Sequence, residues 1–223
     1  AVVCYEGKAY PALAVAGLSA ATGAQPIIKA APGFMQSGQV LDVGGLQIPV
    51  DAKGQLRVSY QMPRSGFVSV SAVDVIQGKV PANMLKGTWA LVGSTAFGGG
   101  DAVPTPQGGA VGGVEVHAQI LSAALDSRTP YSPDWAPLWP LATGALALLV
   151  LIFSLKASGP KAAVVVPAVA LASGAVIFGA HSALLLGAHQ WLGWGQPALF
   201  VALAAALLTA AEMLRVRAER ESL

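Results

Sequence analysis

Residues with the chemical types found in active sites gather between positions 91 and 121. An apolar run leads into a glycine-rich segment, and a segment with helical spacing follows it. Glycines after a strand, together with an acid and a histidine, are typical of nucleotide-binding and catalytic loops. The candidate residues for a ligand loop or a structural signature are Ser94, Gly98, Gly100, Asp101, Thr105, Pro106, Glu115 and His117.

The spacing of these residues does not match the loops that bind phosphate or activate a nucleophile. The patterns GxxxxGK[ST] and GxGxxG are absent, and prolines rather than a helix follow the glycines. The segment "VGSTA" around Ser94 lacks the GxSxG frame of a nucleophile elbow. Asp101, Glu115 and His117 could form a metal site, but residues two positions apart on a helix, such as the last two, do not share a face. We therefore expect no catalytic residue, no metal and no cofactor here.

Two roles remain open for His117. Its position between Val114 and Leu121 places it on the inward flank of a predicted helix. A hydrogen bond to the 101–105 loop would make it a structural residue. As a histidine, it would also be suited to a role in sensing a ligand or protons. Thr105, Pro106 and the glycines are predicted first as turn formers.

The elements around these residues alternate between helix and strand. Gly44 and Gly45 lie between two short apolar runs, which is typical of a hairpin, and 51–54 is a predicted turn. Ser69 or Ser71 is a possible cap for the second predicted helix. We predict helices at 10–22, 72–78, 81–85 and 113–125 and strands at 39–43, 46–50, 55–61 and 88–94. This order favours an α/β domain over a sandwich or a helical bundle.

Five of the candidate residues, from Gly98 to Pro106, then lie in the connection between the 88–94 strand, which ends at Ser94, and the 113–125 helix, which carries Glu115 and His117. This connection has roughly eighteen residues, and loops longer than about 12–15 residues are usually functional or disordered. In an open α/β sheet, ligands bind beyond the carboxyl ends of the strands. The helix itself has an apolar stripe, formed by Val114, Ala118, Leu121 and Leu125.

Composition indicates that part of the chain lies in a membrane. Hydrophobic residues make up 54% of the 223 residues and charged residues 11%, whereas soluble domains carry about 25% charged residues. Three segments are long and apolar enough to span a bilayer: 137–155, 162–187 and 197–214. A buried soluble core is a poor alternative, because residues 162–211 contain no Asp, Glu, Lys or Arg.

The remaining charges predict an orientation for these spans. Lys156 and Lys161 lie between the first two spans, and Arg215, Arg217 and Arg220 follow the third. The positive-inside rule makes this side cytoplasmic. Trp135, Trp139, Trp191 and Trp194 would mark the opposite interface, so residues 1–134 would lie outside the cytoplasm. His181 in the second span is either a proton-relay residue or, as we prefer, a side chain that reaches the nearby outer headgroups.

Residues 1–134 carry balanced charges, so no basic face for nucleic acid is predicted. The single cysteine, Cys4, cannot form an internal disulfide. The chain starts at Ala1 without a signal-peptide pattern, which leads us to expect a piece of a longer protein.

Three motifs precede the closely spaced spans: "YPALAVAGL" from Tyr10, the run "LKG…LVGSTA…GD…TP" from Leu85 to Pro106, and "GVEVHA" from Gly113. Together with the three spans, they resemble the type-two CHASE domain. This domain is an extracytoplasmic sensory module of bacterial adenylate/guanylate cyclases, histidine kinases and serine/threonine kinases. "AVGGVEVHA" departs from the family, which more usually has Met-Pro before the Gly-Val. The resemblance implies a receptor with a cytoplasmic output domain beyond Leu223 and carries over no ligand.

Together these features predict a bacterial inner-membrane sensor. An extracytoplasmic α/β input domain (1–134) would precede three spans and the start of a cytoplasmic signalling helix (215–223). We expect an unknown extracytoplasmic ligand, a homodimer in the lipid bilayer and an output domain outside this chain, with a cyclase favoured over a histidine kinase. The chain itself would not be an enzyme. The alternatives are a membrane-tethered enzyme using Asp101, Glu115 and His117, and a small transporter or assembly factor.

Overall fold

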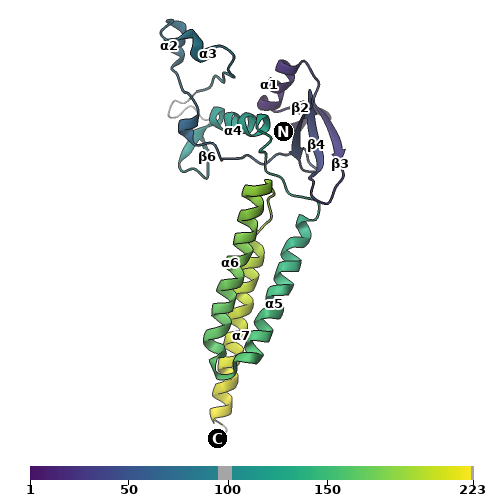
Figure 1. The fold of residues 1–223 in the computed structure, drawn as a ribbon, viewed down its shortest axis with the longest axis vertical. Helices are drawn as coiled ribbons and strands as arrows, with labels where there is room; N and C mark the ends of the chain where they lie inside the picture. Colours follow the sequence, from purple (N-terminus) through teal and green to yellow (C-terminus); the bar gives the residue numbers. More distant parts are fainter. Residues whose placement is uncertain (95–101, 222–223) are drawn as a thin grey trace. The chain divides into compact units, whose positions relative to one another are not determined.

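The computed structural model describes residues 1–94 and 102–221 of the chain and divides into two compact units. Unit 1 consists of Ala1–Ala31 and Gly38–Pro130. Unit 2 consists of Pro32–Ser37 and Tyr131–Leu223. The short segment Pro32–Ser37 thus lies within the sequence of one unit and belongs to the other. Figure 1 shows the elements of both units in sequence colours.

Unit 1 is a mixed α/β region whose sheets are antiparallel. Its helices are α1 (Leu13–Thr22), α2 (Ala72–Ile76), α3 (Ala82–Leu85) and α4 (Gly113–Leu125), with a 3-10 turn at Arg64–Gly66. Its strands are β1 (Val2–Tyr5), β2 (Lys8–Pro11), β3 (Ile27–Ala31), β4 (Gly38–Val43), β5 (Leu46–Val50), β6 (Ala102–Pro104) and β7 (Ala110–Gly112). Among the described residues they form the hairpins β1-β2 and β6-β7 and the three-stranded sheet β3-β4-β5.

The core of unit 1 lies between the three-stranded sheet and two helices. Alternate residues of a strand face the same side, so Leu41 and Val43 of β4 lie beside Ile48 and Val50 of β5, and all four are buried. Helix α1 adds Ala14, Val15 and Leu18 to this cluster, and α4 adds Leu121 and Ala124. Unit 1 thereby holds α4, which carries several of the predicted site residues, against its sheet.

Local signals predicted several of these elements correctly. The hairpin β4-β5 turns at Gly44 and Gly45, which have φ angles of 62° and 92° that suit glycine. Residues 51–54 form the predicted turn, closed by the Gly54 N–H donating to the Asp51 carbonyl at 2.9 Å. Helices α2, α3 and α4 also lie where they are predicted. Ser71 occupies the N-cap position of α2 without a side-chain capping bond.

Three predictions in unit 1 are wrong. Residues 55–61 form no strand; instead, the backbone carbonyls of Tyr60 and Met62 accept side-chain amides from elsewhere. Residues 88–94 form no strand either, and Val92 is 90% exposed. The first helix begins at Leu13 rather than Tyr10, because Tyr10 and Pro11 pair with β1. A local alternation of apolar residues therefore does not ensure a strand when no neighbouring strand pairs with it.

Unit 2 contains three long apolar helices. They are α5 (Trp139–Ser158), α6 (Ala162–Ala188) and α7 (Gly195–Glu221), with 3-10 turns at Ala136–Leu138 and Gly159–Lys161. Candidate membrane spans are Ala136–Ser158, Ala162–Ala188 and Gly195–Glu219, by length and composition. The prediction of three helices able to span a membrane is confirmed. Pro167 lies inside α6 without ending it.

The helices of unit 2 pack along a narrow seam and run side by side in Figure 1. Their buried residues are mostly small or β-branched: Ala147, Leu151, Ala162, Val166, Ile177, Val201 and Ala205. Gly144 of α5 faces Phe200 of α7, where an added Cβ would lie 3.3 Å from the ring. Small residues that allow close approach are typical of helix contacts in membranes.

Candidate functional site

Helix α4 is the centre of the candidate site in unit 1. Glu115 lies in its first turn, where a carboxylate interacts favourably with the helix dipole. The Nε atom of Arg64 donates to Glu115 Oε2 at 3.0 Å. Glu115 is therefore the partner of an arginine rather than a free base or a metal ligand, which weakens the prediction of an Asp101–Glu115–His117 enzyme site.

His117 lies on the same helix and is half-buried. Its Nδ1 atom is buried and has no hydrogen-bond partner among the described residues. The predicted hydrogen bond from His117 to the 101–105 loop is not found at residues 102–105, and Asp101 lies outside the described residues. Both roles proposed for His117 therefore stay predictions.

The other predicted site residues fall in the connection that leads to α4. Gly98, Gly100 and Asp101 lie outside the described residues, and exposed Ser94 precedes this gap. Thr105 and Pro106 form the turn between β6 and β7, as predicted: Gly108 N–H donates to the Thr105 carbonyl at 3.1 Å. The connection is thus partly a hairpin, where a continuous loop was expected.

Two glycines explain how this connection approaches α4 so closely. A Cβ added to Gly93 would lie 2.5 Å from Val114 Cβ, and one added to Gly112 would lie 3.1 Å from the Ser94 carbonyl oxygen. Any larger residue at Gly93 would push the chain away from α4. The glycine-rich signature therefore has a packing role at these two positions.

Two glutamines tie the 59–63 segment to this region. The Nε2 of Gln107, in the β6-β7 turn, donates to the carbonyls of Tyr60 and Met62, each at 2.8 Å. The Nε2 of Gln119 on α4 donates to the same Met62 carbonyl at 2.8 Å. These bonds hold 59–63 as irregular backbone beside α4, whereas the predicted strand covered residues 55–61.

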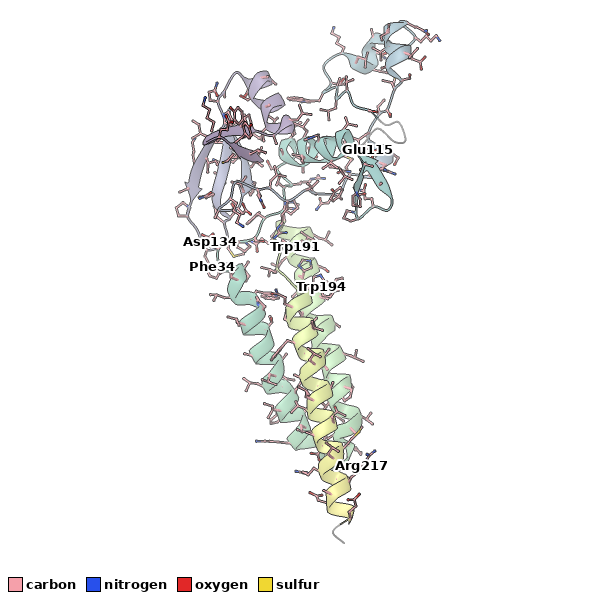
Figure 2. The ribbon with its side chains drawn as sticks, turned by 180° about the vertical axis from the view of Figure 1, so that it is seen from behind. Phe34, Glu115, Asp134, Trp191, Trp194 and Arg217 are labelled. Carbon is pink, nitrogen blue, oxygen red and sulfur yellow. The ribbon has the colours of Figure 1, made fainter. Side chains whose placement is uncertain are left out.

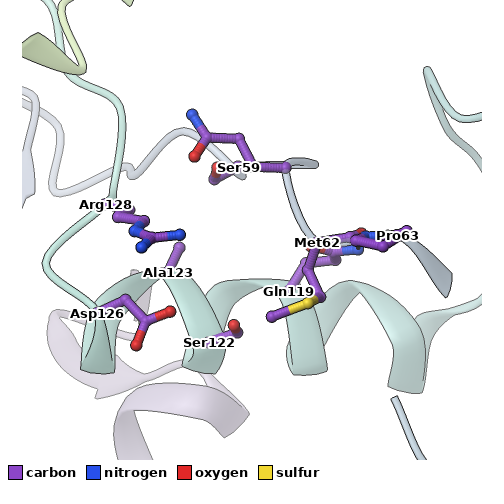
Figure 3. A pocket seen from close by; sticks show the side chains of 9 residues that line it. Ser59, Met62, Pro63, Gln119, Ser122, Ala123, Asp126 and Arg128 are labelled. Atoms are coloured by element: carbon purple, nitrogen blue, oxygen red, sulfur yellow. Dashed lines mark hydrogen bonds between the residues drawn. The ribbon is translucent and has the colours of Figure 1, made fainter. Parts of the chain in front are cut away.

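A cavity of about 220 Å³ lies between this segment and α4 (Figure 3). We call it the α4 cavity. Its lining residues are Ser59, Gln61, Met62, Pro63, Gln119, Ser122, Ala123, Asp126 and Arg128. Sequence reasoning did not identify this cavity, because residues from separate segments build it. The apolar stripe predicted for α4 differs from the buried face as well: Leu125 is 45% exposed, whereas Gln119 is 4% exposed.

Unit 2 contains a second polar centre, which we call the junction: Pro32–Ser37, residues 131–134 and residues 189–191. The Tyr131 hydroxyl donates to the Met35 carbonyl at 2.8 Å. Gln190 Nε2 lies 3.4 Å from the same carbonyl and 3.3 Å from the Tyr131 hydroxyl. Gln190 is 2% exposed, and its two contacts are partly buried, whereas the Tyr131–Met35 bond is exposed to solvent.

Backbone and ring contacts reinforce the junction. The Tyr131 N–H donates to the His189 carbonyl at 2.9 Å, and the Trp191 N–H donates to the Tyr131 carbonyl at 2.6 Å. The Phe34 ring stacks on Trp135, with centroids 5.6 Å apart and planes 15° apart. The junction therefore joins Pro32–Ser37 both to the start of the first long helix and to the α6–α7 connection.

The predicted tryptophan belt lies beside the junction. Trp135 and Trp139 are 6.3 Å apart, and Trp194 meets Phe178 edge-on at 5.1 Å. Figure 2 labels Trp191 and Trp194 toward one end of the helices and Arg217 toward the other. His181 is 3% exposed and stacks edge-on against Trp191 at 4.8 Å. Its predicted reach toward the headgroups is wrong, since it packs inside the helices.

One comparison with known proteins assigns these features to a family. The family model of the CHASE2 domain matches residues 1–158, more than two thirds of the chain. The chain belongs to the CHASE2 family. No curated protein and no solved structure matches it.

The CHASE2 match confirms the resemblance and extends it. The motifs lie between Tyr10 and Leu125, whereas the match continues through α5 to residue 158. It therefore covers the α4 cavity, most of the junction and the first span. This chain combines a CHASE2 sensory domain with three helices able to cross a membrane. The functional roles of the residues between Ser94 and His117 stay predictions.

Proposed function

We propose that this CHASE2 chain is the input and transmission part of a bacterial receptor that detects an extracytoplasmic signal and controls a cytoplasmic output domain. Residues 1–134 form the input domain, and the three spans carry its state across the inner membrane. The observation that supports this most is the junction, where Met35, Tyr131 and Gln190 join three segments of the chain.

The junction offers a route for transmission because its segments are direct continuations of sensory and membrane elements. Pro32–Ser37 connects β3 to β4, whose strands form the core sheet of unit 1. Residues 189–191 connect α6 to α7. A ligand that favours one of two arrangements of the input domain would shift the equilibrium of the whole unit by its difference in affinity.

The charge distribution supports the orientation. Lys156 and Lys161 lie at the α5–α6 connection, and Arg215 and Arg217 lie in the last part of α7. The tryptophans lie toward the other end, so the positive-inside rule places the C-terminus in the cytoplasm. Reporter fusions after Glu221 and before Trp135 test this. We expect a cytoplasmic signal from the first fusion only, and a cytoplasmic signal from the second would contradict the topology.

The output is proposed as an adenylate or guanylate cyclase first and a histidine kinase second, acting in a homodimer. The end of α7 carries mixed charge, with Arg215 paired to Glu212 at 3.2 Å and to Glu219 at 3.5 Å. Such a helix suits the start of a signalling helix. The gene sequence immediately beyond residue 223 discriminates between the two outputs.

A chimera tests transmission without knowledge of the signal. Residues 1–223 would be fused to an adenylate cyclase catalytic domain and the basal activity measured at matched protein levels. Tyr131→Phe removes the hydroxyl that joins Met35 and Gln190, so we expect the basal activity to change by at least about twofold. Tyr60→Phe is the matched control, because only the Tyr60 carbonyl has a described bond. Equal activities of all three proteins would refute transmission through the junction.

A further inference from the structure

The α4 cavity has a floor of buried polar groups, and one of them has an unused hydrogen-bonding atom. Ser59 and Gln119 are 5% and 4% exposed. The Nε2 atom of Gln119 donates to the Met62 carbonyl. The Oε1 atom of Gln119 is buried and has no partner among the described residues. Exchanging the two amide atoms would set two acceptors against each other, so the orientation is fixed. Beside the cavity, Gln119 therefore carries a buried acceptor that lacks a donor within the described part of the chain.

The mouth of the cavity carries one charge of each sign. Asp126 and Arg128 are exposed and line the cavity (Figure 3). Within residues 1–94 and 102–221, neither side chain forms an ion pair. A bound anion would be repelled by the Asp126 carboxylate, and a bound cation would be repelled by the Arg128 guanidinium. A zwitterion satisfies both charges.

Helix geometry sets the arrangement of the polar groups. Gln119, Ser122 and Asp126 are spaced by three and four residues, so they share one face of α4 and its end. Seven residues of helix separate Gln119 from Asp126 by roughly 10 Å. A charged head at Asp126 and Arg128 therefore leaves room for a short side chain to extend past Ser122 toward Gln119. The volume of about 220 Å³ is below the roughly 300–1,000 Å³ of sites for drug-sized ligands.

We propose that the α4 cavity binds a free, small polar amino acid. Arg128 would take the α-carboxylate, Asp126 the α-ammonium group, and Gln119 Oε1 an N–H or O–H donor on the side chain. This inference rests on the proposed sensory function, because it names the chemical class of the signal. An apolar ligand does not fit, since it would remove water from both charges without replacing their partners.

Binding is tested on the purified 223-residue chain in detergent, by calorimetry and thermal shift. The probes are serine, asparagine and glutamine, each compared with matched analogues. For serine these are 3-hydroxypropionate without the amine, ethanolamine without the carboxylate, and alanine without the hydroxyl. We expect saturable binding of at least one amino acid, and binding at least about tenfold weaker for each of its analogues.

Two variants locate the binding site. Arg128→Gln and Asp126→Asn change exposed side chains, so folding should be retained, and each should weaken binding at least about tenfold. Asp74→Asn and Lys79→Gln change an exposed pair outside the cavity and should leave binding unchanged. Equal binding of an amino acid and its amine-free analogue, or unchanged binding in the Arg128 variant, would overturn the proposal. So would no binding by any of the three amino acids.

The binding experiment and the chimera test separate claims, so each can fail without the other. If an amino acid binds as described but the chimera is insensitive to Tyr131→Phe, the cavity assignment stands and the proposed transmission fails. If Tyr131→Phe changes the chimera but no amino acid binds, the cavity assignment fails and the proposed transmission stands.

Discussion

Helices α4 and α6 are both rich in apolar residues, but they bury different kinds of residue. On α4, Leu121 and Ala124 are buried in the core cluster, and Glu115 and Asp126 occupy polar surroundings. On α6, the large residues Leu171 and Val176 are 77% and 70% exposed, and the buried positions include Ala162. Unit 1 is therefore stabilised by moving apolar area out of water. Unit 2 is stabilised by close contact between helices whose outer faces lipid can solvate.

The largest effect should come from truncating a core leucine of unit 1. Leu41 is 1% exposed, so Leu41→Ala removes buried methyl groups and leaves a cavity, at a cost of about 2–5 kcal/mol of unfolding free energy. Leu171→Ala is the matched change on the outer face of α6 and should cost less than about 0.5 kcal/mol. Thermal unfolding of the full chain in detergent measures both. Similar losses would contradict the comparison between the units.

The second prediction tests whether small residues are needed where the helices of unit 2 pack closely. Gly144→Leu forces a side chain against Phe200, where even a Cβ lies at 3.3 Å, and overpacking costs about 1–3 kcal/mol. Gly174→Leu introduces the same side chain on α6 where a Cβ meets nothing within 4 Å. We expect the first variant alone to lower the unfolding temperature in detergent. Equal shifts would indicate that the α5–α7 contact is not tight.

A smaller effect is expected at the junction. Phe34 and Phe153 are both 75% exposed, but only Phe34 is stacked on a tryptophan. Phe34→Ala should therefore change the tryptophan emission and lower stability by about 0.5–1.5 kcal/mol. Phe153→Ala should leave the emission spectrum unchanged. If both variants behave alike, the stack does not persist in solution.

The smallest effect concerns the surface of the sheet in unit 1. The pKa of Asp42 is lowered from its ordinary value because Lys29 Nζ and the Gly45 N–H donate to the carboxylate. A lowered folded-state pKa contributes stability above the unfolded value of roughly 3.9, and this contribution is lost as the pH falls through the folded-state pKa. Asp42→Asn should therefore be slightly less stable than the native chain at pH 7, and this difference should shrink as the pH falls through the folded-state pKa of Asp42. Thermal unfolding across a pH series measures this, and a difference that does not change with pH would refute the linkage.

Local patterns sufficed for some of the fold and failed where distant segments decide the structure. Gly44 and Gly45 between two apolar runs identified the β4-β5 hairpin, and long apolar segments identified the spans. Residues 55–61 alternate like a strand, yet the amide of Gln107 donates to the Tyr60 carbonyl, and both Gln107 and Gln119 donate to the carbonyl of the adjoining Met62. No pattern in the neighbouring sequence predicts such a contact.

The same limit applies to the candidate site. The glycines directed attention to the connection before α4, and Glu115 and His117 directed it to α4 itself; the functional roles of these residues stay predictions. The α4 cavity joins Ser59 to Arg128, and the junction joins Met35 to Gln190 across 155 positions of sequence. Such pairings depend on how complete elements pack, so composition and spacing could not reveal them.

The assignment of Pro32–Ser37 to unit 2 has a consequence for dividing the chain. The backbone passes between the units three times, after Ala31, after Ser37 and after Pro130. A cut after Pro130 would release neither unit intact, because Pro32–Ser37 would remain with the sheet and leave Tyr131 and Gln190 without the Met35 carbonyl. The border between the two units is therefore not a single point in the sequence.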